Sequence, residues 1–394
     1  MGASRRAGRR RLPGGARMTR LRVGVNLSRI DPAELHHADH ALLDSLTAVG
    51  ADPPDDVEIV LFASRSLIKA RPALAAAFET HTFPFPPASA TVRVAAEHSW
   101  LRLAVRRAGL DLLHDAGGTA PGSVDLPRIL SVHDLTPLER PRGVGWLRVL
   151  YHRRMVPRAV AQAAAVIVPS AFVRDRLVQT LHADESRISV VPWPLPPHGE
   201  AAPIENVRAR RGIIGQIVLL PASTKPQEEH LVAVRAMRHL AARHKETTLV
   251  LIGGEGPAER QVQEAIQELH LEERVVRLDG VSEAVRAALF EHAAVVVYPA
   301  VYGSFAHPVL EAMACGVPVV VADAGAAPEL VADAGAVIPH GDDAQLAVEV
   351  HRVLDDPEWR RSMVEAGLER ARAYTARRTA EGLLLAYRSV TAAL

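Results

Sequence analysis

The stretch VVVYPAVYGSFAHPVLEAMACGVPVVVA, residues 295–322, decides the fold. It opens with VVVY at 295–298, a short apolar run of the kind found in strands buried on both faces. Pro299 ends this run, and the small, aromatic and polar residues as far as His307 predict a loop. Mostly helix-forming residues follow, and a second apolar run at 317–321 predicts another buried strand. This order of strand, loop, helix and strand predicts an α/β fold with a parallel sheet.

Two residues mark the ends of the predicted helix. Pro308 suits its first turn, where a backbone N–H would have no partner in any case, and Gly316 suits a left-handed cap after its last turn. Free backbone N–H groups and the helix dipole both favour an anion at such a helix N-terminus. We therefore expect residues 304–309 to bind a phosphate group.

The same region resembles the donor-binding region of the retaining glycosyltransferases of family 4. The resemblance is carried by PVLEAMACGVPVV at 308–320, PEL at 328–330 and GAVIPHGD at 335–342, and it is most specific over 249–372. It implies a GT-B fold, in which two Rossmann-like domains face each other across a cleft and a C-terminal helix crosses back to the first domain. It also implies transfer of a sugar from a nucleotide diphosphate sugar, with retention of the anomeric configuration.

The family motif implies a set of donor-binding residues. Glu311 matches the glutamate that holds the ribose hydroxyls in the family, whereas Gly303 stands where family members usually have a further glutamate. The family generally has an arginine near Ser223 and a lysine near Glu228; neither is present, and Lys225 is the candidate replacement. The remaining residues expected at the donor are Ser304, Phe305, Ala306, His307, Val309, Gly253 and Val281.

The catalytic candidate comes from the first half of the chain. Residues 128–132 predict a strand, and its carboxyl end carries His133, Asp134 and Leu135. Ligands of open α/β sheets bind outside the carboxyl ends of the strands. The HDL sequence resembles the active-site histidine segment of the family, so His133 is expected to face the transferring sugar. The alternative is an ordinary polar strand end, in which Asp134 caps a turn.

Length and composition fit two domains. The chain has 394 residues, of which 48% are hydrophobic, enough for two cores. We expect a disordered basic tail at 1–17, an acceptor-side domain at 18–197, a donor domain at 198–375 and a helix at 376–394 that packs back on the first domain. The proline-rich run after residue 191 suits a stiff linker, with Trp193-Pro194 standing where many relatives have Asn-Gly. A net charge of +1 gives no reason to expect nucleic-acid binding.

Cysteine content and the N-terminus bear on location. The single Cys315 excludes an intramolecular disulfide and fits a reducing cytoplasm. Residues 1–17 contain six arginines but no acid and no apolar segment, so they are not a secretory signal, and translation starting at Met18 remains an alternative. No apolar run reaches the roughly 18–20 residues that span a bilayer. A basic segment can bind anionic lipid, so a peripheral membrane contact remains open.

Apolar spacing predicts the other elements. A helix predicted at 31–49 begins near His36, His37 and His40; because no independent ligand pattern supports a metal site there, we expect a solvated helix start. Strands are expected at 21–27, 57–62, 110–114, 166–169, 188–191, 217–220, 248–252 and 274–278, and other helices at 92–108, 149–164, 172–181, 229–243, 344–354, 357–374 and 379–390.

Three functions are compatible with these features. The favoured one is a glycosyltransferase that needs no metal and no cofactor beyond its nucleotide-sugar co-substrate, and that acts on a carbohydrate, lipid-linked or small-molecule acceptor. The alternative is a catalytically impaired binding or regulatory protein, because several motif positions are altered and a fold alone does not confer activity. A sugar-nucleotide epimerase would need a carboxylate pair in the cleft, and no persuasive pair is found. Two of the expected donor-binding residues also have alternatives without a role at the donor. Glu311 is then a solvated helix carboxylate, and His307 is then an ordinary loop histidine.

Overall fold

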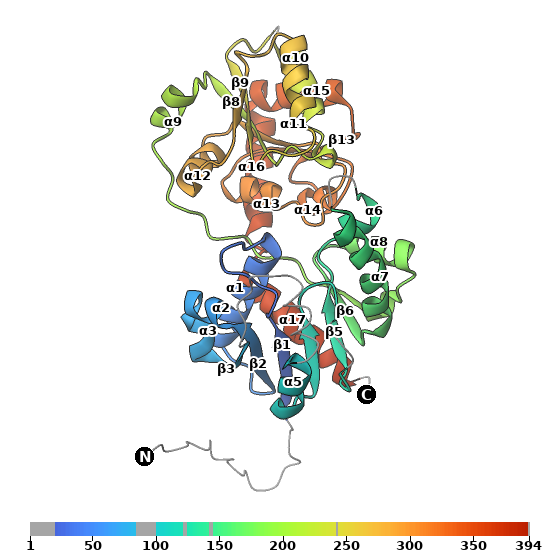
Figure 1. The fold of residues 1–394 in the computed structure, drawn as a ribbon. Helices are drawn as coiled ribbons and strands as arrows, with labels where there is room; N and C mark the ends of the chain where they lie inside the picture. Colours follow the sequence, from blue (N-terminus) through green and yellow to red (C-terminus); the bar gives the residue numbers. More distant parts are fainter. Residues whose placement is uncertain (1–19, 84–99, 121–123, 142–144, 242, 393–394) are drawn as a thin grey trace.

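The computed structural model describes residues 20–83, 100–120, 124–141, 145–241 and 243–392. Within them the chain builds two parallel α/β sheets, one above the other in Figure 1, joined by the linker after β7 and by the chain between α16 and α17. The predicted tail at 1–17 and residues 92–99 of the helix predicted at 92–108 lie outside the described residues. The two-domain α/β architecture expected from the sequence is confirmed.

The first sheet has the strand order β3-β2-β1-β4-β5-β6-β7, and every neighbouring pair is parallel. Its strands are β1 (Leu21–Asn26), β2 (Val57–Ser64), β3 (Glu79–Phe83), β4 (Leu112–Asp115), β5 (Arg128–Ser131), β6 (Ala165–Val168) and β7 (Ile188–Val190). The helices around it are α1 (His37–Ala51), α2 (Arg65–Ala70), α3 (Pro72–Ala77), α5 (Arg102–Ala108), α6 (Thr136–Glu139), α7 (Trp146–Gln162) and α8 (Ala171–Leu181).

The second sheet has the order β10-β9-β8-β11-β12-β13, again all parallel. Its strands are β8 (Gln216–Pro221), β9 (Thr247–Ile252), β10 (Val275–Leu278), β11 (Val295–Tyr298), β12 (Val319–Ala322) and β13 (Ala336–Ile338). The helices after the linker are α9 (Ile204–Arg211), α10 (His230–Leu240), α11 (Glu259–Glu268), α12 (Glu283–Glu291), α13 (His307–Ala314), α14 (Ala327–Val331), α15 (Asp343–Asp355), α16 (Pro357–Ala371) and α17 (Ala376–Ala392).

The stretch at 295–322 forms β11, α13 and β12, as predicted. Pro308 lies in the first turn of α13, and Gly316 follows the helix with φ of 68°, the left-handed conformation that glycine adopts without a Cβ penalty. Ala306, before the helix, also has a positive φ of 58°. The second strand begins at Val319 and not at Val317, because the Val317 N–H donates to the Ala312 carbonyl oxygen of α13 (2.9 Å).

Several predicted boundaries are wrong. The first helix begins at His37 and not at Asp31, since the Asp39 carboxylate accepts a hydrogen bond from the His36 N–H (2.9 Å) and fixes the helix start there. Helix α10 ends at Leu240, three residues before the predicted end. The short elements α2, α3, β3, α6, α9, α11, α12, α14 and β13 were not predicted.

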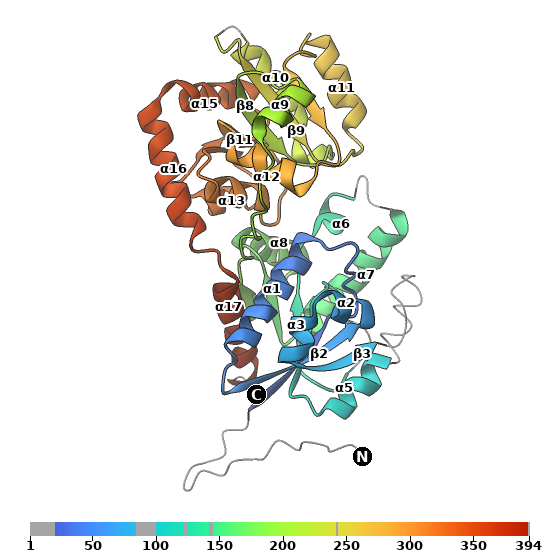
Figure 2. The same cartoon turned by 90° about the vertical axis from the view of Figure 1, so that its left-hand side faces the viewer.

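Helix α17 crosses back to the first domain, as the resemblance implied. It packs alongside α1, which Figure 2 shows, and buries Tyr387 completely in the first domain's core. The Tyr387 hydroxyl lies 2.9 Å from His114 Nδ1, and Arg388 forms a two-pronged ion pair with Asp56 (2.7 and 2.8 Å). The last helix therefore belongs structurally to the first sheet.

The two chain crossings between the domains lie side by side. The Leu195 N–H donates to the Tyr374 carbonyl oxygen (2.9 Å), and the Thr379 hydroxyl donates to the Pro192 carbonyl oxygen (2.8 Å). The linker and the start of α17 are thereby held together. Among the described residues, no helix combines the length and the apolar character that crossing a bilayer requires.

Buried histidines make stability fall in acid. His114 is held between Tyr387 and the Ser131 hydroxyl (2.7 Å), and burial lowers the pKa of His114 to about 3. Its ordinary pKa is 6.5, so its contribution is present above pH 6.5 and is lost as the pH falls toward 3. We expect the free energy of unfolding to drop by about 1.4 kcal/mol per pH unit for each such group below pH 6.5.

Urea titrations between pH 7.5 and 4.5 measure this slope. His114→Gln, which keeps a polar side chain but cannot titrate in this range, is expected to flatten it. The exposed His270→Gln provides the control and should leave the slope unchanged. Equal slopes for wild type and His114→Gln would contradict the assignment.

Candidate functional site

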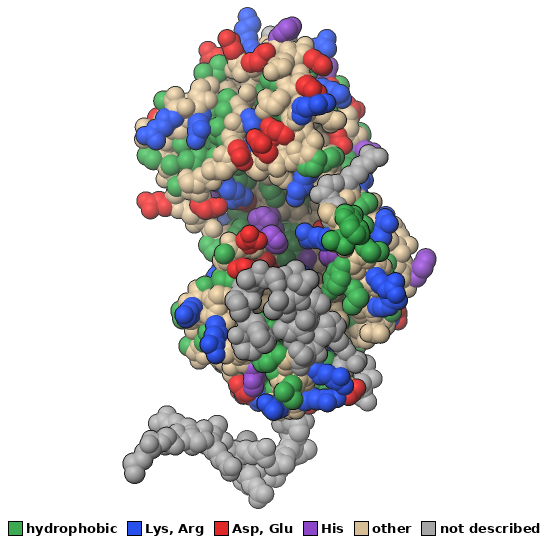
Figure 3. Space-filling view, viewed as in Figure 1, with side chains coloured by type: hydrophobic (Ala, Val, Ile, Leu, Met, Phe, Trp, Pro, Cys, Tyr) green, Lys and Arg blue, Asp and Glu red, His purple; other side chains and the backbone are tan. Residues whose placement is uncertain are grey.

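A hollow separates the two domains, and histidine side chains gather in it (Figure 3). The residues around this hollow come from both sheets and from the linker. His133 follows strand β5 of the first sheet, whereas the loop 299–306 and helix α13 follow strand β11 of the second. The structure therefore brings the catalytic candidate and part of the predicted donor site to one cleft.

His133 lies with its Nε2 atom 2.9 Å from the Ala116 carbonyl oxygen. A carbonyl only accepts hydrogen bonds, so this contact assigns the proton to Nε2 and leaves Nδ1 as the acceptor. Burial lowers the pKa of His133, which keeps the ring neutral near pH 7. Its ring lies against Trp193, with 5.5 Å between the centroids. A neutral histidine so held can orient a sugar hydroxyl through Nδ1.

Trp193, in the linker, contacts aromatic rings of both domains. Besides His133, its ring contacts Phe305 (5.3 Å between centroids) and stacks on His307 (5.2 Å). His37, at the start of α1, stacks on His307 in turn (4.5 Å). Five rings from both domains and the linker thus form one aromatic cluster. The sequence predicted Trp193 only as part of a linker and His37 only as part of a solvated helix start. His36 and His37 are exposed, which confirms the second expectation, but the stacking of His37 on His307 was not predicted.

His307 is the first residue of α13 and is 6% exposed. Burial lowers its pKa to about 3, so the ring is neutral at physiological pH. His307 therefore lies buried at a helix start and not in the loop, and its contact with the donor stays a prediction. Among the described residues, no backbone N–H of 304–307 donates to another residue, Pro308 has none, and the Val309 N–H donates to Ala306. The amides free to bind an anion are those of 304–307, a shorter set than the predicted 304–309.

Glu311 forms a two-pronged ion pair with Arg286 of α12. The carboxylate is buried at 5% exposure, and burial raises the pKa of Glu311 against the opposing effect of the Arg286 charge. Arg286 also lies 4.8 Å from the centroid of the Phe290 ring. The alternative of a solvated helix carboxylate is therefore wrong. Arg286 was missed because it lies 25 residues before its partner, on a helix that was not predicted.

The ends of β8 and β9 approach closely at Gly253. A Cβ atom there would lie 2.6 Å from the backbone of Ala222 and 2.7 Å from the Ser223 nitrogen, and φ is 132°, so only glycine fits. The Thr224 hydroxyl joins the two loops, accepting from the Gly256 N–H (2.8 Å) and donating to Glu259 (2.6 Å). This rigid turn presents backbone toward the space beyond the strands.

The expected cation Lys225 is exposed, and its ammonium group has no partner among the described residues. Three residues on, burial raises the pKa of Glu228 to about 7, with Lys225 acting against the rise. Negative charge on Glu228 in turn contributes to the raised pKa of Tyr298, whose main cause is burial. Where the family has a lysine, this chain therefore has a carboxyl that is partly protonated at neutral pH.

The remaining predicted residues fall into two groups. Ser304 contacts the first domain: its carbonyl oxygen accepts from the Ser170 hydroxyl (2.7 Å). A separate contact comes from α14, where Glu329 accepts from the Ala171 N–H (3.0 Å). The second group is held in the donor-domain core: Ala306 and Val309 are buried, and Val281 is partly buried against the same cluster.

Gly303 lies in a crowded position. A Cβ atom there would come within 2.8 Å of the Tyr298 hydroxyl, and the Gly303 carbonyl oxygen accepts from the Ala326 N–H (2.9 Å). Gly325 packs against the same backbone. A glutamate at this position thus requires movement of the buried Tyr298 ring, which the sequence does not reveal.

Restoring the family glutamate is expected to require two changes. Gly303→Glu alone gains little transfer from common hexose donors, whereas Gly303→Glu with Tyr298→Phe, which removes the clashing hydroxyl, is expected to raise it about tenfold. The gain is that of one hydrogen bond to a charged acceptor, about 1.5–3 kcal/mol. Initial rates of the four variants, with Tyr298→Phe alone as control, measure this. Equal rates for Tyr298→Phe and the double variant would contradict the expected sugar contact.

Family models match both halves of the chain. The model described as Glycosyltransferase Family 4 matches residues 51–197, and that described as Glycosyl transferases group 1 matches residues 214–370. Together they span the first sheet's domain from the end of α1 onward and almost the whole donor domain.

Curated relatives are similar over part of their length. The chain is 25% identical over 200 residues to an O-antigen chain mannosyltransferase of Salmonella typhimurium, covering 48% of this chain and 50% of that one. It is 28% identical over 249 residues to a D-inositol 3-phosphate glycosyltransferase of Frankia alni (58% and 60%). It is 27% identical over 294 residues to an MMP alpha-(1→4)-mannosyltransferase of Mycolicibacterium hassiacum (68% and 68%). The matches thus span about half to two thirds of these relatives.

Solved structures match nearly the whole chain. Sucrose-phosphate synthase from Thermosynechococcus elongatus superposes with a TM-score of 0.71 at 20% identity, covering 95% of this chain and 100% of that one. HepE of Anabaena, in complex with UDP and glucose, gives 0.69 at 18% identity (94% and 100%). At sequence identities this low, the superpositions establish the fold alone. The family is established by the two family models. The chain belongs to the glycosyltransferases of family 4, group 1, and has their GT-B fold.

Proposed function

We propose that this protein transfers a sugar, with retention of configuration, from a nucleotide diphosphate sugar to an acceptor. The observation that carries the proposal is the convergence on one cleft of His133 from the first domain and the α13 N-terminus with the Glu311–Arg286 pair from the second. The known structure of HepE with UDP and glucose, on the same fold, supports a nucleotide-sugar donor. Hexose donors are favoured because two of the relatives described above are named as mannosyltransferases.

The proposed reaction requires the cleft to stabilise developing negative charge. The leaving nucleoside diphosphate gains negative charge as the glycosidic bond breaks, and preorganised donors lower that cost. The free amides of 304–307 and the Arg286 guanidinium supply such donors, so the proposal requires neither a metal nor a further cofactor. Glu311 orients Arg286 and accepts from the ribose hydroxyls, while His133 accepts from a hydroxyl of the transferring sugar.

A donor screen tests the proposal. Thermal shift is measured with UDP, GDP and dTDP and their hexose and deoxyhexose derivatives, because a ligand at ~100 times its Kd adds ~2.7 kcal/mol of stability. Donors that bind are then assayed for transfer and for hydrolysis. We expect one donor class to bind and to be turned over. If nucleotides bind but no donor in the screen is transferred or hydrolysed, the protein is a binding or regulatory protein and not a transferase.

The acceptor side is proposed to meet an anionic membrane. Four large apolar side chains of α7 are exposed: Trp146 (73%), Leu147 (64%), Leu150 (57%) and Tyr151 (39%). The same helix carries four exposed arginines and no acid: Arg148, Arg153, Arg154 and Arg158. An apolar stripe bordered by arginines matches the chemistry of an anionic bilayer surface. Since α7 packs against α6, the helix that directly follows the His133 segment, a lipid-linked acceptor is proposed.

Vesicle sedimentation tests the membrane contact. Binding to vesicles with 30% phosphatidylglycerol is expected, with little binding to pure phosphatidylcholine. Leu147→Ser with Leu150→Ser should weaken it at least fivefold, whereas Leu103→Ser and Leu385→Ser, two exposed leucines elsewhere, should not. Equal binding of all variants would remove α7 as the contact and leave the transferase proposal unaffected.

A further inference from the structure

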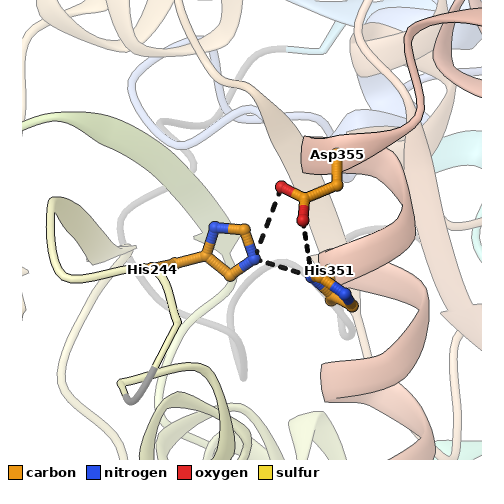
Figure 4. A group of neighbouring side chains, drawn as sticks. All are labelled: His244, His351 and Asp355. Carbon is orange, nitrogen blue, oxygen red and sulfur yellow. Dashed lines mark hydrogen bonds and ion pairs between the residues drawn. The ribbon is translucent and has the colours of Figure 1, made fainter.

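A histidine–aspartate cluster lies in the donor domain, outside the cleft. His244 follows α10, and His351 and Asp355 are one turn apart on α15, the helix that packs on α10. Figure 4 shows the two imidazole rings and the carboxylate pointing toward one another. In the described part of the chain, this is the one group of three or more His, Cys, Asp or Glu whose ligand atoms converge, all within 4.8 Å of one another.

The spacing of these atoms is close to that of ligands around a metal ion. His244 Nε2 lies 2.8 Å from His351 Nδ1, and the two Asp355 oxygens lie 3.8 and 3.4 Å from those nitrogens. One proton can sit between the two rings, but then the carboxylate is at the limit of hydrogen-bond length or beyond it. In a tetrahedral site with bonds of about 2.0–2.2 Å, neighbouring ligand atoms lie about 3.3–3.6 Å apart. The Asp355 distances are within about 0.2 Å of this range, whereas the two ring nitrogens must move apart by about 0.5–0.8 Å to reach it.

The surroundings favour a cation. Asp355 is the last residue of α15, where the negative end of the helix dipole disfavours a carboxylate and favours positive charge. The backbone of His244 is fixed, because its N–H donates to Leu240 (2.9 Å) and its carbonyl oxygen accepts from Arg274 (3.1 Å). The positive charge of Arg243 competes with a metal ion for Asp355. Arg243 lies 3.6 Å from Asp355, and its side chain is 71% exposed and free to turn into solvent.

We propose that His244, His351 and Asp355 bind a divalent transition-metal ion, zinc being the best match, with water in a fourth position. Two imidazoles and one carboxylate are ligands that suit Zn²⁺ and exclude Mg²⁺ and Ca²⁺, which take oxygen ligands. The site links the start of β9 to the end of α15. Because α10 and α15 lie at the end of the donor domain away from the first domain (Figure 1), the ion stabilises this domain and takes no part in transfer.

Zinc titration tests the proposal. Protein without a polyhistidine tag is freed of metal with a chelator and titrated with Zn²⁺ against a chromophoric competitor, and with Co²⁺, whose visible absorption reports a tetrahedral site. One equivalent is expected to bind to the wild type. His244→Ala and His351→Ala should weaken binding at least tenfold, and Arg243→Ala should strengthen it severalfold.

His239→Ala is the matched control. His239 lies on α10 and contacts Asp343 of α15 (2.9 Å), so it shares the helix pair and the histidine–aspartate contact but lacks a second histidine. It should bind zinc like the wild type. Asp355→Asn, which keeps the side-chain shape, should weaken binding and serves if a histidine variant fails to fold. Zinc affinities of Asp355→Asn or His351→Ala equal to that of His239→Ala would overturn the proposal, whatever the donor screen gives.

Discussion

Replacing His133 by alanine is expected to lower the rate of sugar transfer by about 100- to 1000-fold, the usual effect of losing one oriented hydrogen bond in a transition state. The affinity for nucleoside diphosphate should change less than about threefold, because His133 belongs to the first domain and the phosphate groups are proposed to bind to the second. Steady-state rates measure the first effect and calorimetric titration with the nucleotide measures the second. Unchanged values in both would show that His133 has no part in the site.

A packing role for His133 must be separated from a chemical one. Its ring lies against Trp193, so alanine also removes an aromatic contact across the cleft. His133→Phe keeps that contact and removes both nitrogens. We expect His133→Phe to be as slow as His133→Ala. If His133→Phe transferred sugar at the wild-type rate, His133 would act only by holding Trp193.

Replacing Glu311 by alanine is expected to weaken nucleotide-donor binding by about tenfold or more without unfolding the protein. Glu311 holds Arg286 in a two-pronged ion pair, and its loss frees the guanidinium that we propose to contact the leaving phosphate. Breaking a fully buried pair costs about 3–5 kcal/mol. The cost here is smaller, because the Arg286 side chain keeps 24% of its surface exposed. Nucleotide titration and urea unfolding measure the two effects.

A double-mutant cycle with Arg286→Ala assigns the role of Glu311. If Glu311 acts only by orienting Arg286, its removal has no further effect in the Arg286→Ala background. If it also accepts from the ribose hydroxyls, as we expect, the loss of affinity persists there. Glu283→Ala, an exposed carboxylate on the same helix as Arg286, is the control and should leave donor binding unchanged. Full affinity in Glu311→Ala would contradict both roles.

Local signals in the sequence predicted the framework of the donor domain. The β-branched runs at 295–298 and 317–321, Pro308 and Gly316 each act through their own backbone preferences, and the structure places strand, helix start and helix end accordingly. The return of the last helix to the first domain was carried by the family resemblance alone, because no local pattern encodes a partner more than 270 residues away.

The contents of the cleft were harder to predict. Trp193 lies in a proline-rich run that indicates only stiffness, and nothing local places its ring between His133 and His307. Arg286 is one of many arginines, and only the fold brings it to Glu311. The crowding of Gly303 by Tyr298 likewise depends on side-chain placement. Strand and helix positions follow from short segments, whereas a site assembled from two sheets and a linker depends on their packing.

The place of α17 has a consequence for synthesis on the ribosome. The first domain emerges first, but Leu383, Leu384 and Tyr387, which complete its core, lie on α17, after all strands of the donor domain. The donor domain, whose strands and core residues all precede α17, becomes complete earlier. The order of maturation is therefore reversed relative to the usual N-terminal-first order. A chain that ends before α17 would contain every strand and core residue of the donor domain but would lack the residues of α17 that pack against α1 in the first domain.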